Sequence, residues 1–428
     1  MSLAKNQCSK TAPRPVTMGS GGKCIIVCAL GLTAVCAFAG NSLNAFNPGK
    51  IWPDNNGQHI NAHGGGILFH DNVYYWFGQH MVQGKAGNTA QVGVSVYSST
   101  DLYNWKDEGI ALRVSDDPKS DIAKGCIIER PKVIYNAKTK TFVMWFHHEL
   151  PGHGYRSARS GIAIADKPAG PYTFVGSFRP NAGHWPQNAT SEQKDPLSIE
   201  KAAAEKDNFS GGFSEKHKAF NILGAHMKNG QMARDMALFV DDDGRGYHIY
   251  SSEHNSTLHI ALLTDDYLDH TGSYVRVFPL RWMEAPAIFK RKGKYYLIAS
   301  DCTGWSPNAA RSAVADSMFG PWKELGNPCA GSSKNGDLGP EVTFGGQSTY
   351  VFPVKNKDDA YIAMFDLWRP KNAIDGRYAW LPVTFDEEGF KIKWRSNWNL
   401  SFFDENHGQG NSSKQSAAGD VLMPAPEK

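Results

Sequence analysis

Hydrophobic residues in this 428-residue chain are concentrated in short runs that polar turn residues separate. Five of these runs read alike, with aromatic and β-branched residues gathered in a short stretch: 72–80, 140–148, 246–254, 294–302 and 359–367. Runs of this length and composition, bounded by turn residues, are typical of β-strands. The acidic-glycine turn "DDDG" predicts a tight hairpin before the third run.

A second pattern follows each of these runs. In "VGVSVYSSTDLYNW" and "SGIAIADKPAGPYTF", a strand leads into a turn that contains an aspartate and closes on an aromatic residue. The repeating unit is therefore a hairpin, a strand, a turn and a further strand, and it occurs five times. We predict an all-β fold, a five-bladed β-propeller with four-stranded blades. The period alone would also fit a β-sandwich, but the five copies and the aspartate–aromatic closures favour the propeller.

The N-terminal segment has the pattern of a targeting signal. The apolar run "CIIVCALGLTAVCAFA" follows Lys23 and ends in an A-x-A site. This pattern predicts a signal peptide over residues 1–39 with cleavage after Ala39, and lipidation at Cys36 is the alternative. We therefore expect an exported protein, located in the periplasm, in the medium or at the cell surface.

The rest of the chain is expected to form one catalytic domain and a tail. Residues 40–407 would make up the propeller, with a long insert at about 176–230 between the second and third units. Within the insert, "DPLSIEKAAAEKD" predicts one short helix. An insert of this length is expected to form a wall of a binding site or a lid. Residues 408–428 are polar and low in complexity, and we expect them to be disordered.

The charge distribution excludes two classes of partner. The four basic residues before position 40 stand in a segment without acids, and the remainder carries 41 basic and 42 acidic residues. A nearly neutral domain does not favour a nucleic acid, or an anionic membrane once the signal is removed. Aromatic residues make up 12 % of the chain, which suits strands and a stacking surface for sugar rings. An oligo- or polysaccharide substrate is the partner that fits, whereas the oligomeric state has no signal in the sequence.

Three cysteines lie beyond the signal segment: Cys126, Cys302 and Cys329. Their spacing does not match a metal site, and an odd number allows at most one disulfide. Cys302 with Cys329 is the pair that we expect if a disulfide forms, and buried free thiols are the alternative.

The start of each innermost strand is the expected place of a functional site. In a propeller these strands line a central channel, so polar groups at the same place in successive blades converge. The residues at these places are His63, Glu129, Asp235, Glu284 and Gln347. Two or three carboxyl groups in one aromatic-lined pocket are what glycoside hydrolysis uses, because one carboxyl group protonates the leaving oxygen. A neighbouring carboxylate raises the pKa of such an acid and keeps it protonated near neutral pH.

Tryptophans supply the candidate stacking surfaces. Trp282, Trp305 and Trp145 lie near the expected site and could stack on sugar faces, with core packing as the alternative for each. His63 could face the channel as a substrate-binding residue, with a structural role as the alternative. We find no phosphate-binding loop, dinucleotide fingerprint, zinc-protease motif or serine nucleophile elbow.

Between about 58 and 400 the sequence resembles glycoside hydrolase family 43, whose members are five-bladed propellers. "MEAPAIFKRKGKYYL" is similar to the family's glutamate-x-proline motif, which implies that Glu284 is the general acid. "RDMALFVDDDGRGYHIY" is similar to the third-blade motif, which implies that Asp235 orients the acid and modulates its pKa. The resemblance implies an enzyme that hydrolyses O-glycosyl bonds and requires no cofactor. Some relatives hold a calcium ion in the channel, but no cluster of metal ligands in this sequence indicates one.

The first blade departs from the family pattern. "AHGGGILFHDNVYYWFG" has a glycine near position 64, where the family has the aspartate that acts as general base. Together with "ERPKV" and "GGQSTYV", this stretch resembles the branch that contains exo-β-1,3-galactanases. In that branch the base position falls to a fifth-blade glutamine, implying Gln347, and a second-blade glutamate holds the substrate, implying Glu129. An amide is a poor base, so Gln347 is expected to position the water, directly or as an imidic-acid tautomer, and Glu129 is the reserve base.

The resemblance implies an exo-acting glycoside hydrolase that releases galactose from the β-1,3-galactan of plant arabinogalactan with inversion. An α-L-arabinofuranosidase or another exo-glycosidase is the first alternative. A carbohydrate-binding propeller without catalysis is the second, because of the missing aspartate.

Overall fold

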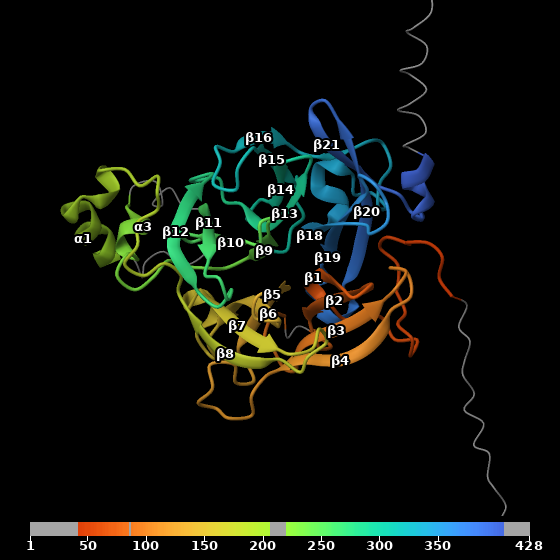
Figure 1. The fold of residues 1–428 in the computed structure, drawn as a ribbon, viewed down its shortest axis with the longest axis horizontal. Helices are drawn as coiled ribbons and strands as arrows, with labels where there is room; N and C mark the ends of the chain where they lie inside the picture. Colours follow the sequence, from red (N-terminus) through yellow and green to blue (C-terminus); the bar gives the residue numbers. More distant parts are fainter. Residues whose placement is uncertain (1–41, 85–86, 206–219, 406–428) are drawn as a thin grey trace, which may run out of the picture. The chain divides into compact units, whose positions relative to one another are not determined.

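The computed structural model describes residues 42–84, 87–205 and 220–405, and its main feature is a ring of five antiparallel sheets (Figure 1). The first sheet contains β1 (His63–His70), β2 (Val73–Gln79), β3 (Gly93–Ser99) and β4 (Lys106–Arg113). The second contains β5 (Ile127–Asn136), β6 (Thr141–Glu149), β7 (Arg159–Ala165) and β8 (Thr173–Phe178). The third contains β9 (Met236–Val240), β10 (Gly246–Ser252), β11 (Thr257–Leu263) and β12 (His270–Val277).

The last two sheets follow the same order. The fourth contains β13 (Glu284–Arg291), β14 (Lys294–Ser300), β15 (Arg311–Ala315) and β16 (Lys323–Gly326). The fifth contains β18 (Gln347–Pro353), β19 (Tyr361–Leu367), β20 (Arg377–Asp386), β21 (Gly389–Lys393) and the two-residue β17 (Cys329–Ala330). The predicted five-bladed propeller is confirmed. The fifth sheet gains one strand, because β17 pairs in parallel with β21 before the chain reaches β18.

The innermost strands are β1, β5, β9, β13 and β18, and neighbouring sheets meet along these strands. β5 lies beside β1 and β9, and β13 lies beside β9 and β18. β18 and β1 close the ring, where the Thr349 hydroxyl donates to the Gly65 carbonyl at 2.8 Å. The second strands are covered on both faces, and every residue of β10 is buried. Packing between sheets therefore brings the starts of all five inner strands toward one centre.

The chain ends of the propeller are joined at the ring closure. Backbone hydrogen bonds of 2.7 and 3.1 Å pair Phe46 with Trp398, and their rings stack at 4.5 Å. Trp52, Trp76 and Trp380 pack into the same aromatic cluster. This cluster explains much of the high aromatic content, which thus serves the core as well as the site.

The insert between the second and third sheets carries the predicted helix. α1 (Pro196–Glu205) and α3 (Ile222–Ala225) lie beside the third sheet, at the far left of Figure 1. Side-chain hydrogen bonds join the insert to the outer strand β12, since Tyr274 donates to the His184 carbonyl and Asn188 donates to that of Arg276. The described part of the insert is thus attached at the outer edge of a blade.

The Cys302–Cys329 disulfide does not form, and the alternative of free thiols holds. Cys126, Cys302 and Cys329 are free thiols. Cys329 lies in β17 beside β21, whereas Cys302 follows β14 and faces a pocket, which gives the two side chains different neighbours. Within the described residues no helix is long and apolar enough to cross a membrane. The predicted signal, the Cys36 alternative and the tail from 408 lie outside the described residues.

Candidate active site

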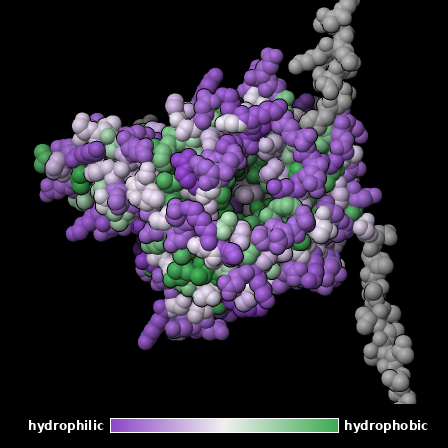
Figure 2. Space-filling model, in the orientation of Figure 1, coloured by the Kyte–Doolittle hydropathy of each residue, from purple (hydrophilic) through white to green (hydrophobic). Residues whose placement is uncertain are grey.

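A pocket of about 410 Å³ opens where the inner strands begin, and Figure 2 shows the molecule hollowed near its centre. Residues of all five sheets and their loops line it: Gln79, Asn88, Glu129, Arg130, His147, Tyr155, Arg234, Asp235, Asn255, Glu284, Cys302, Gly304, Trp305, Gln347 and Trp368. Five residues that the sequence singled out are therefore brought together, namely Glu129, Asp235, Glu284, Gln347 and Trp305. Among the described residues of the insert, none lines this pocket.

Glu284 is held at the head of β13 by an irregular backbone. The pairing of β13 with β14 shifts between Glu284 and Ala287, and Ala285 has φ 51°. Glu284 Oε1 accepts hydrogen bonds from Asn255 Nδ2 at 2.7 Å and from Cys302 Sγ at 3.1 Å. Burial and the charge of Asp235 raise the pKa of Glu284 to about 7. A carboxyl group with this pKa holds a proton over the lower half of the physiological pH range.

Asp235 lies directly beside this acid. Its Oδ2 accepts a hydrogen bond from the backbone N–H of Ala285 at 3.1 Å and forms an ion pair with Arg130 Nη2 at 3.1 Å. Asp235 thus contacts the residue that follows Glu284 in the chain. The two carboxyl groups share one pocket, within reach of a single sugar.

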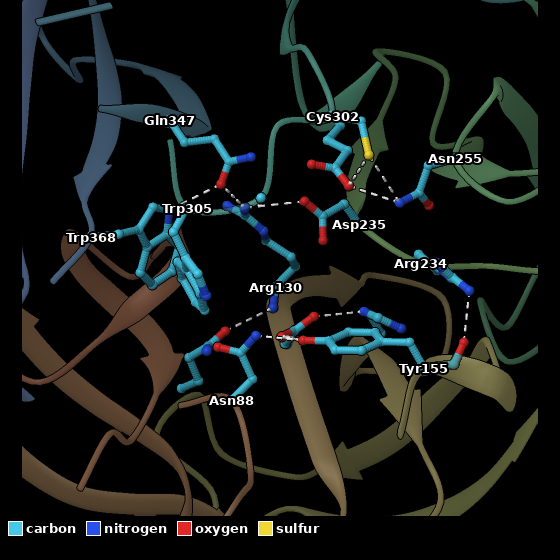
Figure 3. A pocket seen from close by; sticks show the side chains of 15 residues that line it. Asn88, Arg130, Tyr155, Arg234, Asp235, Asn255, Cys302, Trp305, Gln347 and Trp368 are labelled. Carbon is cyan, nitrogen blue, oxygen red and sulfur yellow. Dashed lines mark hydrogen bonds and ion pairs between the residues drawn. The ribbon is translucent and has the colours of Figure 1, made fainter. Parts of the chain in front are cut away.

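Gln347 is fixed on another side of the pocket (Figure 3). Its Oε1 accepts hydrogen bonds from Arg130 Nη2 at 2.5 Å and from Trp368 Nε1 at 2.9 Å. Its Nε2 donates to the Ser300 hydroxyl at 2.9 Å. Because Arg130 and Trp368 are obligatory donors, the amide orientation is determined: the carbonyl oxygen faces them, and one N–H remains for the pocket.

Trp368 and Trp305 form an aromatic corner next to Gln347. Their rings meet edge to face, with centroids 5.7 Å apart. The guanidinium carbon of Arg130 lies 5.5 Å from the Trp368 ring centroid. Trp305 is 45 % exposed, so its face is available to a flat ligand such as a sugar ring.

Glu129 belongs to a chain of buried charged groups. Its Oε2 lies 2.9 Å from His147 Nδ1, and its Oε1 accepts from the Tyr155 hydroxyl at 2.6 Å. The other nitrogen of His147 lies 3.0 Å from Glu149. Burial opposes the charge of His147, but the two carboxylates outweigh it and raise its pKa to about 9. His147 is therefore a cation between two glutamates, and Asn88 donates to Tyr155 at the outer end of the chain.

These groups do not form a good site for a calcium ion. Ligand atoms of Glu129, His147 and Asp235 lie within 4.8 Å of one another. Both nitrogens of His147 are already engaged by carboxylates, and Arg130 places its positive charge against Asp235. Calcium prefers a shell of oxygen ligands without a cation beside it. The geometry thus matches an ion-pair network rather than a metal centre.

Three of the sequence candidates lie outside the pocket lining. His63 is fully buried, 5.2 Å from the Tyr378 ring and 6.0 Å from the Trp368 ring, and burial lowers its pKa to about 3. Trp282 is 4 % exposed, and Trp145 is buried with its Nε1 donating to the Tyr267 carbonyl. The prediction that His63 and Trp282 bind substrate is therefore corrected: buried rings like these offer no face to a sugar.

Arg130 is the main residue that the sequence reasoning missed. Strand alternation places neighbouring residues on opposite faces, so Glu129 and Arg130 should diverge. Instead the register of β5 shifts between Glu129 and Lys132, and Arg130 has φ 53°, which turns both side chains into the pocket. The adjacent proline in "ERP" was the available signal of an irregular strand. Asn255, Cys302 and Trp368 come from loops, and Tyr155 comes from the short 3-10 helix Gly154–Arg156; the pattern gave no signal for these residues.

Gly64 occupies the place of the missing aspartate. It has φ 62°, and a Cβ atom there would lie 2.8 Å from Gln79 Oε1. Its backbone N–H donates to the buried carboxylate of Asp366 at 2.9 Å. Burial raises the pKa of Asp366 to about 6. This corner therefore has backbone conformation and packing suited to a glycine.

A comparison with protein-family models matches residues 182–363 to glycosyl hydrolases family 43. Over 125 residues the chain is 30 % identical to a β-D-galactofuranosidase of Aspergillus niger, a match that spans 26 % of this chain and only 36 % of that enzyme. This match is therefore confined to a segment of each protein.

Solved structures match far more of the chain. A family 43 β-1,3-galactosidase, solved with galactodeoxynojirimycin, is 51 % identical with a TM-score of 0.75, and the match covers 83 % of this chain and all of that one. An exo-β-1,3-galactanase from Phanerochaete chrysosporium, solved with β-1,3-galactotriose, is 29 % identical, covering 84 % of this chain and 68 % of the other, with a TM-score of 0.65. An exo-β-1,3-galactanase from Clostridium thermocellum is 32 % identical over 82 % of this chain and 66 % of that one, with a TM-score of 0.64. The chain therefore belongs to glycoside hydrolase family 43.

Proposed function

We propose that this protein is an exo-acting hydrolase that releases galactose from the ends of β-1,3-galactan with inversion of configuration. The observation that carries the proposal is Glu284, a carboxyl group with a pKa of about 7, facing a pocket with Asp235 beside it. The similarity to galactanases and a β-1,3-galactosidase supports galactose as the terminal sugar. Lining residues from all five sheets surround the pocket, which suits the end of a glycan rather than its middle.

The acid step falls to Glu284. Its proton passes to the glycosidic oxygen while the bond from that oxygen to the anomeric carbon breaks, and the electron pair of the bond stays with the leaving sugar. Burial, and after it the negative charge of Asp235, raise the pKa of Glu284 and keep this proton in place near neutral pH. Arg130, paired with Asp235, limits the effect, so the proton remains transferable.

Gln347 and Glu129 together act on the attacking water and the groups around it. Both acceptor directions of the Gln347 carbonyl are used by Arg130 and Trp368, so the amide offers the pocket an N–H and no free acceptor. An imidic-acid form would direct an O–H at two donors, which is unfavourable. We therefore assign Gln347 to hold the reacting groups in place and Glu129, which lies beside the His147 cation, to accept the proton of the attacking water.

The test is product analysis with three substrates. The protein is incubated with β-1,3-galactan, an aryl α-L-arabinofuranoside and an aryl β-D-galactofuranoside, and released sugars are quantified. We expect galactose from the galactan alone, without larger oligosaccharides, and the first-formed anomer to be α by proton NMR. Arabinose release would instead identify the protein as an α-L-arabinofuranosidase. Binding of galactan without any product would make it a carbohydrate-binding propeller and overturn the proposal.

We also propose that the protein acts outside the cytoplasm. The support is the basic-then-apolar segment that ends in "AFA" at residues 37–39. N-terminal sequencing of the mature protein is expected to begin at Gly40. A lipid on Cys36, or a mature chain that begins before Gly40, would contradict cleavage after Ala39.

A further inference from the structure

We infer that Asn255 and Cys302 are positioning residues that place the proton of Glu284 on Oε2, the oxygen that these donors leave free to meet the substrate. The inference rests on the proposed acid role of Glu284. It adds a structural reason for that role, namely two donors that converge on one oxygen of the carboxyl group and a rigid turn that holds one of them.

The two donors distinguish the oxygens of the acid. Asn255 Nδ2 and Cys302 Sγ both lie within hydrogen-bond distance of Glu284 Oε1, at 2.7 and 3.1 Å. In a protonated carboxyl group the carbonyl oxygen is the better acceptor, so two donors at Oε1 leave the hydroxyl on Oε2. Among the described residues, no side chain donates to Oε2. In Figure 3, Cys302 and Asn255 lie together on one side of the pocket.

A strained turn delivers Asn255 to this position. Glu253, His254 and Asn255 have φ values of 51°, 57° and 68°, three successive residues in the left-handed region. Residues other than glycine adopt this conformation at a cost, and asparagine tolerates it best. All three are buried, so packing around them must maintain the turn.

The anchor of the turn is a buried ion pair. Arg276 donates to both oxygens of Glu253, at 2.6 and 2.7 Å, and His259 Nε2 lies 2.9 Å from Glu253 Oε1. β11 and β12 supply these partners, which lie away from the pocket lining. A buried bidentate pair fixes the start of the turn, and its end then holds the Asn255 amide against Glu284.

These contacts also act after proton transfer. When the Oε2–H bond breaks and the proton bonds to the glycosidic oxygen, Glu284 becomes an anion. The N–H and S–H donors stabilise this anion, because hydrogen bonds to an ionised acceptor are the stronger ones. The leaving sugar departs neutral, while the attacking water bonds to the anomeric carbon and gives its proton to Glu129, so the step balances.

The test compares two leaving groups. Galactobiose needs a proton on its departing oxygen, whereas 2,4-dinitrophenyl β-galactoside has a leaving group that departs without one. Cys302→Ala and Asn255→Gly remove the donors, and glycine keeps the left-handed backbone. We expect kcat on galactobiose to fall about tenfold in each variant, while kcat on the aryl galactoside stays within about twofold of wild type. Cys302→Ser, which restores a donor, should recover part of the loss.

A pH profile supplies the second readout. Loss of a donor to Glu284 disfavours its anion, so the alkaline limb of kcat/KM on galactobiose should move upward by about half a unit in Cys302→Ala. Cys126→Ala, which removes a buried thiol away from the pocket, is the matched control and should leave the limb in place. Equal losses on both substrates, or an unmoved limb, would overturn the inference.

A remote variant tests the anchor. Arg276→Gln is expected to reproduce the leaving-group dependence of Asn255→Gly, since it releases the turn without touching the pocket. If Arg276→Gln does not fold, Cys302→Ala and Asn255→Gly still test the inference. A wild-type protein that cleaves neither galactoside would remove the proposed function, and this inference with it. If the wild type cleaves both galactosides and each variant loses activity equally on the two, this inference is wrong while the proposed function stands.

Discussion

Two glutamates at equivalent places in the second and fourth sheets have different electrostatic surroundings. Glu284 is half-buried beside Asp235, and desolvation together with the negative charge of Asp235 raises its pKa to about 7. Glu129 is buried beside His147, whose pKa is raised to about 9 and which is therefore a cation. A carboxyl group that is removed from water beside another carboxylate keeps its proton, whereas one beside a cation forms an ion pair. The comparison teaches that the charge of the partner adds to burial, and that it distinguishes the side of the pocket with the acid from the side where the family's usual base is missing.

Removal of the acid is expected to have the largest effect. Glu284→Gln keeps the shape of the side chain but has no transferable acidic proton, so kcat on galactobiose should fall about a thousandfold. Galactose binding, measured by calorimetry, should change little. Glu387→Gln, at an exposed turn, is the control and should retain full activity. A Glu284→Gln variant with more than a tenth of wild-type kcat would give the acid role to another residue.

Removal of the negative charge of Asp235 should lower the pKa of Glu284, so that Glu284 loses its proton more readily. In Asp235→Asn the pKa of Glu284 falls by about one unit or more, because burial alone now raises it while Arg130 still lowers it. The wild-type rate depends on protonated Glu284, so kcat/KM should decline above about pH 7, and in the variant this alkaline limb moves to lower pH. At pH 7 we expect a loss of about a hundredfold: about fivefold comes from the smaller protonated fraction of Glu284, and the rest from the lost ion pair that holds Arg130 and the Ala285 backbone in place. The loss should be smaller at pH 5, where the acid is protonated again.

The control for this prediction is Asp116→Asn at an exposed position. Its pH profile should match that of the wild type. An alkaline limb that stays in place in Asp235→Asn would show that burial alone sets the pKa of Glu284, and the comparison between the two glutamates would lose its electrostatic basis.

Changes at Gln347 test what the other side of the pocket supplies. Gln347→Ala leaves the Arg130 and Trp368 donors without their acceptor and should lower kcat about thirtyfold. Gln347→Glu still accepts both donors and is expected to retain about a third of the wild-type rate. Initial rates on galactobiose measure both variants. A Gln347→Glu variant faster than wild type would show that the site lacks only a carboxylate base.

The sequence predicted the architecture well for a physical reason. Strand, turn and aromatic signals recur five times, and the phase of each repeat places Glu129, Asp235, Glu284 and Gln347 at equivalent positions. The repeat could not place side chains where the backbone leaves regular geometry. Arg130 enters the pocket through a shifted register at φ 53°, and Asn255 does so through a left-handed turn. His63 and Trp282 had the right position in the chain, but nearby irregular backbone directs both rings into the core.

The smallest expected effect concerns Gly64, where the family aspartate is missing. Its φ of 62° disfavours any side chain, and a Cβ atom there would lie 2.8 Å from Gln79 Oε1. Gly64→Ala should therefore lower the free energy of unfolding by about 1–2 kcal/mol, measured by denaturant titration. Gly176→Ala, in open space on β8, is the matched control with little change.

Gly64→Asp sharpens the comparison further, because it returns a carboxylate to the position of the missing family aspartate. We expect no gain in kcat, since Arg130 and Gln79 occupy the space that such a side chain would need and Arg130 would pair with it. Activity assays at pH 6 to 8 on galactobiose check this expectation. A gain would mean that the backbone at Gly64 adapts and that the ordinary base position is still accessible in this chain. An unchanged or lower rate would show that Arg130 fills the space of the missing aspartate, so that a carboxylate at position 64 no longer reaches the substrate.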